Sequence, residues 1–213
     1  GRHMSIAPLK GPVTYARRGP YYLADFDKLM APVVARWARD AAELFWLAPS
    51  TPAPLTAAKV VNWPGADGGP RLFYRDGLIE PIGYCELNPM PGQPGHYWIG
   101  HCVVRPEQRG AGLGRLLMEL VLEEAFARGA YRVSLMVFPE NEAACRCYRS
   151  VGFREVGDQY KQFPTSDRRH RMVQMSLGRE GYLTARHAAR GKTCAPGGMN
   201  RAIGTTTPKT GKV

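Results

Sequence analysis

Hydrophobic residues recur at spacings of three and four across residues 112–128, which makes this segment the clearest helix signal in the chain. One face of that helix collects its apolar positions, Leu113, Leu116, Leu117, Leu120, Val121 and Ala125. Gly129 then provides a C-terminal stop. The nearly continuous apolar run at 131–138 predicts a central strand, and Asn141 is expected to cap a second helix that extends to about Ser150.

Alternating or apolar runs elsewhere predict the remaining strands. They are expected at residues 13–17, 71–75, 79–87, 96–104, 153–163 and 171–177. A helix is predicted from Asp25 or Asp27 to about Arg39, and a shorter one from a Thr56 cap to about Trp63. A strand–helix–strand crossover in the middle of this order predicts an α/β fold, in which helices cover the faces of a mixed sheet.

Composition places the chain among ordinary globular proteins. With 213 residues, 44% of them hydrophobic and 22% charged, it suits one α/β domain with appendages. A wholly disordered chain, a collagen and a disulfide scaffold are excluded. The net charge of +11 is unusual, and residues 179–213 hold seven basic residues against one acidic residue. Such a balance favours an anionic partner such as nucleic acid, a membrane surface or a phosphorylated cofactor.

The two ends of the chain are expected to lie outside the folded domain. The stretch from Gly1 to Met4 has the form of an expression scar, and the domain is predicted over residues 5–178. Hydrophobic periodicity fades from Gly178 onward, so we predict a basic, flexible tail at 179–213. A solvated extension is favoured for this tail over an encounter with nucleic acid or the ribosome.

The cysteines and the apolar runs exclude two further classes. The five cysteines lack the paired spacing of a zinc site, so no metal is expected. Cys145 and Cys147 are two residues apart in a predicted helix and therefore face different sides. Unpaired thiols suit the reducing cytoplasm, which is the expected location. The chain has no run of about 18 apolar residues, so no membrane span is predicted.

Three glycines separate the strand at 96–104 from the clearest helix, in the sequence Arg109-Gly110-Ala111-Gly112-Leu113-Gly114. Glycines lack side chains, so backbone N–H groups can approach a ligand closely, and the helix N-terminus adds partial positive charge. The loop is therefore a candidate anion site suited to a pyrophosphate, which the side chains of Arg109 and Arg115 would reinforce.

This glycine loop has three alternative interpretations. A glycine turn without a ligand is the simplest alternative. A Rossmann dinucleotide site is disfavoured, because no suitable acidic residue ends the next strand. A Walker P-loop is excluded, because no Gly-Lys-Ser/Thr follows the glycines.

Residues 102–153 as a whole resemble the GNAT superfamily of acetyl-CoA-dependent N-acetyltransferases. The loop at 109–114 matches the family's Q/R-x-x-G-x-G/A pattern. The family's N-x-x-A-x-x-x-Y-x-x-x-G-F pattern is matched by Asn141, Ala144, Tyr148 and Gly152-Phe153. The resemblance implies a mixed, mostly antiparallel central sheet of six or seven strands flanked by about four helices. It also implies acetyl-CoA as the cosubstrate and an amine-bearing molecule as the acceptor.

The resemblance implies roles for residues of this chain. The coenzyme A pyrophosphate would be bound by loop amides from Arg109, Gly110, Ala111, Gly112, Leu113, Gly114 and Arg115. Cys102, Val103 and Val104 would pair with the pantetheine arm, and a backbone N–H there would polarise the thioester carbonyl. Asn141 would contact the pantetheine or an ordered water as well as capping its helix. Tyr148 would protonate the departing thiolate.

The sequence leaves the general base open. The family often places a Glu on the strand equivalent to 96–102, but this chain has no carboxylate there. His101 has a suitable unperturbed pKa, and Glu86 on the preceding strand is the other candidate. Water-mediated proton transfer is the third. By strand alternation, His101 is expected to point away from Cys102.

The leading hypothesis is an N-acetyltransferase that acts by direct attack of a primary amine on the thioester, the amine belonging to a small molecule, a protein N-terminus or a lysine. A non-catalytic acyl-CoA-binding sensor is the alternative, because the strand carboxylate is missing. A nucleic-acid-binding protein driven by the tail is the third hypothesis. Trp37, Trp46 and Trp63 either line an acceptor pocket or anchor a small helical cap. The sequence also leaves open whether the chain forms a homodimer.

Overall fold

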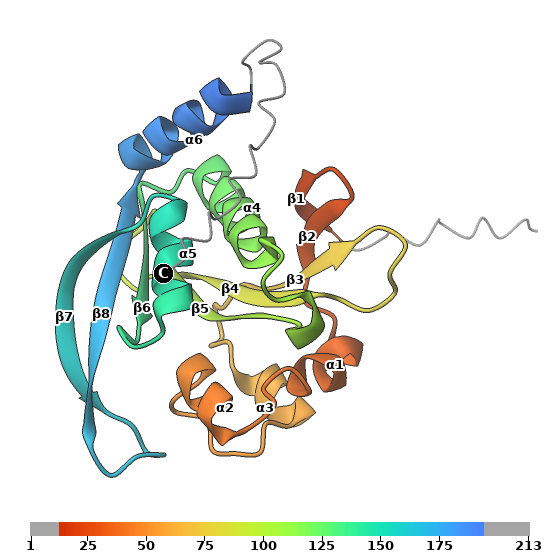
Figure 1. The fold of residues 1–213 in the computed structure, drawn as a ribbon, viewed down its shortest axis with the longest axis vertical. Coiled ribbons are helices and arrows are strands. Elements are labelled where there is room, and N and C mark those ends of the chain that lie inside the picture. The colour runs from red at the N-terminus through yellow and green to blue at the C-terminus, as the bar shows by residue number, and fades with distance from the viewer. Residues whose placement is uncertain (1–12, 194–213) are drawn as a thin grey trace, which may run out of the picture.

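Eight strands form one continuous mixed sheet in the computed structural model, which describes residues 13–193 (Figure 1). In chain order they are β1 (Thr14–Arg18), β2 (Tyr21–Asp25), β3 (Pro70–Arg75), β4 (Gly83–Pro89), β5 (His96–Val104), β6 (Arg132–Val137), β7 (Arg154–Gln162) and β8 (Arg169–Gly178). Their spatial order is β1-β2-β3-β4-β5-β6-β8-β7. Within this sheet only the β5–β6 pair is parallel, because a helical crossover joins these two strands.

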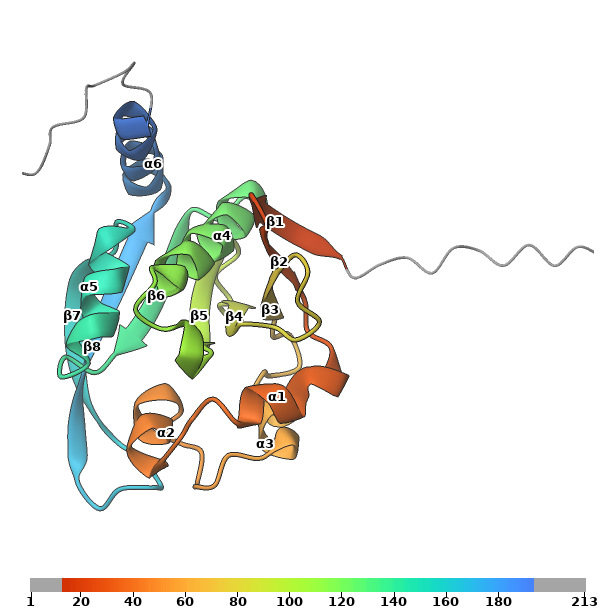
Figure 2. The same ribbon diagram turned by 45° about the vertical axis from the view of Figure 1, so that its right-hand side comes forward.

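Six α-helices of the described segment flank the sheet. They are α1 (Ala31–Ala35), α2 (Ala41–Leu47), α3 (Ala57–Asn62), α4 (Leu113–Ala127), α5 (Glu142–Ser150) and α6 (Arg179–Thr193). Short 3₁₀ turns precede α1 at Lys28–Met30 and α4 at Pro106–Gln108. In both views α1, α2 and α3 gather at one end of the molecule, away from α4 and α6 (Figure 1, Figure 2). None of the described helices is long and apolar enough to cross a membrane.

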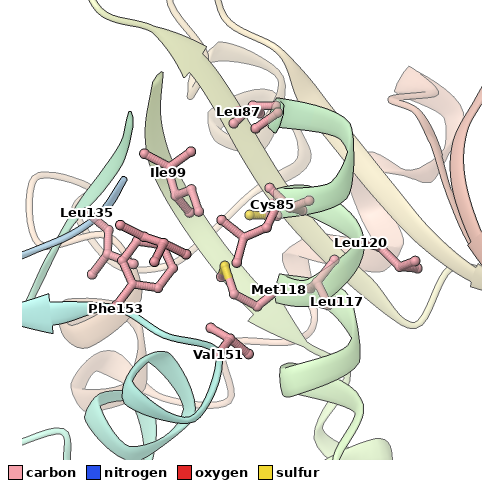
Figure 3. Packing of buried hydrophobic residues seen from close by; sticks show 14 of the residues in the cluster. Cys85, Leu87, Ile99, Leu117, Met118, Leu120, Leu135, Val151 and Phe153 are labelled. Carbon is pink, nitrogen blue, oxygen red and sulfur yellow. The ribbon is translucent and has the colours of Figure 1, made fainter. Parts of the chain in front are cut away.

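The main core lies between α4 and the sheet (Figure 3). Leu117, Met118 and Leu120 of the helix share this cluster with Cys85 and Leu87 of β4, and none of the five is more than 1% exposed. Burial of one such leucine or methionine contributes about 2 kcal/mol. This layer therefore fixes α4, and with it the glycine loop at its N-terminus, against the sheet.

A second core lies on the opposite face of the sheet. Successive residues of a strand point to opposite faces, and Tyr84 joins this second cluster whereas its neighbour Cys85 joins the main core. Val34 of α1 and Val60 of α3 pack here, and both are fully buried. The sheet thus separates the α4 layer from the α1–α3 layer.

The predicted class, an α/β fold with a mixed and mostly antiparallel sheet, is confirmed, with eight strands in place of six or seven. The strand that the sequence does not predict is β2, where the pattern indicates only a turn and a helix cap. Its Tyr-Tyr-Leu-Ala run is apolar throughout because β2 lies inside the sheet, between β1 and β3. The helix predicted to reach Arg39 is wrong in extent: α1 is short, with Pro32 in its first turn, and α2 begins only after an Asp40 cap.

Helix α6 corrects the prediction of a flexible tail for residues 179–193. This helix continues directly from β8 and lies beyond the end of that strand (Figure 1). Tyr182 stacks on Phe126 of α4 with ring centroids 4.3 Å apart. Arg179 donates hydrogen bonds to the backbone carbonyls of Phe126 (2.9 Å) and Ala130 (3.2 Å). The sequence pattern hides the helix because one buried tyrosine, in place of an apolar stripe, anchors it. The predicted scar at 1–4 and the tail from 194 onward lie outside the described residues.

A buried ion pair joins α4 to β3. Arg71 donates to both carboxylate oxygens of Glu124, at 2.7 and 3.0 Å, and the two side chains are only 6% and 3% exposed. The guanidinium also lies over the ring of Tyr15, 3.7 Å from its centroid. These contacts link strands β1 and β3 to α4, the helix that follows the glycine loop.

Candidate active site

Strands β5 and β6 separate after three paired residues. Their parallel pairing runs from His96↔Arg132 to Trp98↔Ser134. β5 nevertheless continues to Val104, so its edge towards β6 is unpaired along 99–104 within the described part of the chain. A cavity of about 1190 Å³ opens there and is lined by both strands. The N–H and C=O groups of an unpaired strand edge can bind an extended ligand.

The glycine loop lines the same cavity and is shaped by two left-handed residues. Gly110 and Gly112 have φ values of +80° and +76°, a conformation that residues with a side chain rarely adopt. The first backbone bond into α4 runs from the N–H of Leu116 to the carbonyl of Gly112, at 3.2 Å. No acceptor within residues 13–193 is recorded for the amides of residues 110–115. Free N–H groups at a helix N-terminus form an anion site.

The side chain of Arg109 forms hydrogen bonds to other groups of the protein. Its guanidinium donates to the backbone carbonyls of Val104 (2.9 Å) and Trp37 (2.8 Å) and to the carboxylate of Glu43 (3.0 Å). The expectation that this side chain reinforces the anion site therefore does not match the structure. Arg109 instead fixes the glycine loop to the segment that joins α1 and α2. Arg115, on the first turn of α4, pairs with Glu119 at 3.1 Å and keeps its side chain 51% exposed.

Most of the residues predicted to bind the cofactor come together around this cavity. It is lined by Cys102, Val103, Val104, Arg109, Gly110, Gly112, Gly114, Arg115, Asn141 and Tyr148. Ala111 and Leu113 are not among the lining residues, and Leu113 packs in the main core. Asn141 caps α5 as predicted, because its side-chain oxygen accepts a hydrogen bond from the N–H of Ala144 at 3.3 Å.

A bulge in β5 places the side chain of His101 on the same face of the sheet as Glu86. Between the pairings of Tyr84 and Glu86, β5 has one residue more than β4, and such an insertion shifts the alternation of side chains between the two faces. Ile99 packs in the main core, yet His101 lies on the opposite face beside Glu86. Cys102 packs against the main core, so His101 and Cys102 point away from each other as predicted.

Glu86 and His101, the two candidate bases, form one hydrogen-bonded pair. Nδ1 of His101 lies 2.9 Å from a carboxylate oxygen of Glu86, and the same oxygen accepts the hydroxyl of Tyr84 at 2.7 Å. Burial, followed by the nearby Glu86 carboxylate, raises the pKa of Tyr84 and keeps it a donor. An ionised carboxylate can only accept, so this contact requires a proton on Nδ1 and leaves Nε2 of that tautomer as an acceptor.

Two neighbours hold this pair in place. The ring of Trp63 stacks on His101, with centroids 4.4 Å apart and planes within 12°. Its own Nε1 donates to the hydroxyl of Thr51 at 2.9 Å. Gly100 supplies the room for the carboxylate, since a Cβ there would lie 2.5 Å from an oxygen of Glu86. Both contacts bring together residues that are far apart in sequence, and the sequence analysis did not predict them.

Tyr148 reaches the cavity from α5. Its ring packs against Phe153 in an edge-to-face arrangement, and the structure records no hydrogen-bond partner for its hydroxyl among residues 13–193. Burial, together with the nearby thiols of Cys102, Cys85 and Cys147, raises its pKa above the ordinary value of 10.0. The phenol therefore keeps its proton at neutral pH and can donate it within the cavity.

The cavity is also lined by residues that the sequence analysis missed. Trp98 of β5, Asn88 of β4 and Lys161 of β7 all line it. Strand alternation offered a signal for Trp98, which stands two residues before Gly100 on the same face. No motif in the sequence around Lys161 predicts that it lines the cavity, because β7 lies outside the segment that contains the glycine loop and Tyr148. Residues 13–193 hold no group of three or more side chains arranged to bind a metal ion.

Residues 38–153 match the Acetyltransferase (GNAT) family, and the chain belongs to this family. It is 36% identical over 74 residues to the ribosomal protein bS18-alanine N-acetyltransferase of Escherichia coli (strain K12), a match that covers 35% of this chain and 50% of that protein. The chain spans half or less of the length of the curated relatives it matches.

Solved structures share the fold at lower sequence identity. Spermidine N-acetyltransferase from Vibrio cholerae in complex with CoA and spermine superposes with a TM-score of 0.65 at 17% identity, over 78% of this chain and 99% of that one. Aminoglycoside acetyltransferase AAC(6')-Ib in complex with coenzyme A gives a TM-score of 0.60 at 21% identity, with the same coverage of 78% and 99%.

Proposed function

We propose that this chain transfers the acetyl group of acetyl-CoA to a primary amine. One observation carries the proposal. The unpaired edge of β5, the free amides at the start of α4 and the hydroxyl of Tyr148 open into one cavity that also contains the Glu86–His101 pair. Membership of the GNAT family supports the same reaction.

The residues around the cavity fit acetyl-CoA. The amides of residues 110–115 can hold a pyrophosphate at the N-terminus of α4. The β5 edge along 99–104 can hydrogen-bond the amide groups of an extended pantetheine arm, in the manner of an added strand. Arg115 and Arg146 line the cavity from α4 and α5 and add positive charge for the phosphates. When bound, acetyl-CoA supplies an acetyl group activated as a thioester.

The chain's own side chains divide the proton transfers between them. An acceptor amine is an ammonium at neutral pH and must lose a proton before it attacks. Nε2 of His101 takes that proton, and Glu86 stabilises the imidazolium that results. A backbone N–H of residues 102–104 stabilises negative charge on the carbonyl oxygen. Attack of the free amine on the carbonyl carbon forms the C–N bond, and the nitrogen then loses its second proton to solvent as the C–S bond breaks. Tyr148 gives its phenolic proton to the departing sulfur, and a proton from solvent restores the phenol.

A non-catalytic acyl-CoA sensor is the alternative function. Its motivation is the missing carboxylate along 96–102. The Glu86–His101 pair weakens that motivation, because the neighbouring strand brings a carboxylate to a histidine that lines the cavity. The sensor hypothesis predicts that acetyl-CoA binds and that no amine increases its turnover.

Release of the coenzyme A thiol tests the proposal directly. The purified chain is mixed with acetyl-CoA and a panel of amines, and free thiol is followed spectrophotometrically while mass spectrometry identifies the acetylated amine. Amine-dependent thiol release with a matching product supports the transferase. Binding of acetyl-CoA in a calorimeter without release for any amine supports the sensor. Failure to bind acetyl-CoA contradicts both functions.

A further inference from the structure

Tryptophan side chains contribute aromatic surface to the cavity that contains His101. Trp63 stacks on His101 itself, while Trp46 of α2 and Trp98 of β5 line the same space. Neither Trp46 nor Trp98 has an aromatic stacking partner among the described residues, and Trp46 is 49% exposed. These three tryptophans come from different parts of the chain and line the same cavity as His101.

Both carboxylates that line the cavity are already engaged by neighbouring side chains. Its lining contains two carboxylates, Glu43 and Glu86. Glu43 accepts hydrogen bonds from Arg39 (2.6 Å) and Arg109 (3.0 Å), and although burial opposes it, these bonds hold its pKa below the ordinary value. Glu86 is buried against Tyr84 and His101. Neither carboxylate is free to receive a second ammonium group from a ligand.

Positive charge is in excess around the same space. The cationic side chains that line it are Arg39, Arg109, Arg115, Arg146 and Lys161. Arg115 and Arg146 lie on the α4–α5 side, towards the proposed phosphate site, whereas Lys161 enters from β7. No acidic partner for Lys161 is recorded among residues 13–193. A second ammonium group of a polycationic ligand would meet repulsion from Lys161 and would be buried without a carboxylate partner, which is costly.

We infer that the acceptor is a primary monoamine joined to a planar, apolar body, and that polyamines and other polycations are poor acceptors. This inference rests on the proposed acetyl transfer. The single ammonium is directed to the Glu86–His101 pair, and the apolar body packs on the indole rings of Trp46, Trp63 and Trp98. The inference separates this chain from the spermidine and aminoglycoside acetyltransferases that share its fold.

A set of three related amines separates the effect of substrate charge on the rate from the effect of substrate shape. Hexylamine and 1,6-diaminohexane have the same carbon chain and differ by one ammonium group, and 2-phenylethylamine adds a flat ring to a monoamine. We expect kcat/KM for hexylamine to exceed that for 1,6-diaminohexane by about tenfold, since a second buried ammonium has no partner. We expect 2-phenylethylamine to exceed hexylamine by about fivefold through ring packing. Spermidine and kanamycin should be acetylated more slowly than either monoamine.

Two variants test the residues named. Trp46→Ala should raise KM for 2-phenylethylamine by about fivefold and change KM for hexylamine less. Tyr160→Ala is the matched control, since Tyr160 is an aromatic residue that is 59% exposed and does not line the cavity. Lys161→Glu should narrow the preference for the monoamine over the diamine by at least about threefold, because it introduces an unpaired carboxylate.

The inference and the proposed function fail in different ways. Diamine or spermidine turnover equal to that of the monoamines, or a Trp46→Ala variant that behaves like Tyr160→Ala, overturns the inference and leaves acetyl transfer intact. Preferred acetylation of a peptide N-terminus or lysine also overturns it. If no amine is acetylated, titration of each amine into the CoA-loaded chain still decides the inference: tighter binding of 2-phenylethylamine than of 1,6-diaminohexane supports it, and the reverse order overturns it.

Discussion

Nδ1 of His101 lies 2.9 Å from the carboxylate of Glu86, across the β4–β5 strand pair. The contact depends on the extra residue in β5, which brings His101 to the Glu86 face, and on Gly100, which leaves room for the carboxylate. The sequence offered these two residues as competing bases, and the structure joins them in one unit. A buried carboxylate that orients a histidine leaves Nε2 free to accept a proton, which is what an ammonium substrate requires.

Tyr148→Phe should reduce kcat by about 100-fold, because the departing thiolate loses its proton donor. The KM for acetyl-CoA should change little, since the phenylalanine ring keeps the packing against Phe153. The pKa of Tyr148 is raised above 10.0, so wild-type kcat should not decline below that pH through loss of the phenolic proton. Steady-state kinetics across pH check both statements. A variant with near wild-type kcat would remove Tyr148 from the proposed chemistry.

Gly112→Ala should weaken binding of coenzyme A by at least about tenfold, because an alanine at φ +76° is strained and displaces the loop amides. Gly77→Ala is the matched control. Gly77 also has a positive φ, of +85°, and an added Cβ there also meets nothing within 4 Å, but it does not line the cavity.

Both glycine variants should lose about 1 kcal/mol of unfolding free energy from backbone strain, and only Gly112→Ala should lose coenzyme affinity. Urea unfolding and isothermal titration with coenzyme A measure the two effects separately. Equal coenzyme affinity in the two variants would contradict the anion site at the loop.

Glu124→Gln should lower the free energy of unfolding by about 3 kcal/mol, because it leaves the Arg71 guanidinium buried without its full counter-charge. Asp76→Asn is the contrasting variant. Asp76 pairs with Arg17 on the surface, where both side chains are about half exposed, and its loss should cost no more than about 1 kcal/mol. Urea unfolding of both variants tests the difference, and equal losses would contradict a structural role for the buried pair.

His96 should make stability depend on pH in the mildly acidic range. Burial, assisted by nearby Arg132, lowers its pKa below the ordinary 6.5, so the unfolded chain takes up a proton at a higher pH than the folded chain does. The contribution of His96 is therefore complete above pH 6.5 and is lost as the pH falls towards its lowered folded value. Urea midpoints measured at several pH values should fall more steeply with acid for wild type than for His96→Gln. Parallel curves would show that His96 is not responsible.

Local signals in the sequence were sufficient for the elements that frame the site. The glycines at 110–114, the Asn141 cap and the apolar face of α4 each act within one or two helical turns, and the structure reproduces all three. The Thr56 cap of α3 belongs to the same class, with its hydroxyl accepting from the N–H of Lys59 at 3.3 Å. Such features depend on neighbours in sequence and can be predicted from them.

Tertiary context decided what the sequence could not show. The position of His101 depends on a bulge whose register is visible only against β4. Arg109 looked like a phosphate ligand, but its partners Trp37 and Glu43 come from a distant segment. Helix α6 is held by contacts of Tyr182 and Arg179 with Phe126 of α4. In each case the decisive partner lies on another element, at least 15 residues away, where no periodic pattern can indicate it.

The most direct test of the account is the rate of amine acetylation by Glu86→Gln, measured from about pH 6 to about pH 9 beside wild type and with coenzyme A affinity determined for both. Gln keeps the size of the side chain and removes the charge that stabilises the His101 imidazolium. We predict a loss of about 100-fold in kcat/KM for the amine, a changed acidic limb of the pH profile and unchanged coenzyme affinity. A variant that retains wild-type kcat/KM and the wild-type pH profile would contradict the proposed role of the Glu86–His101 pair.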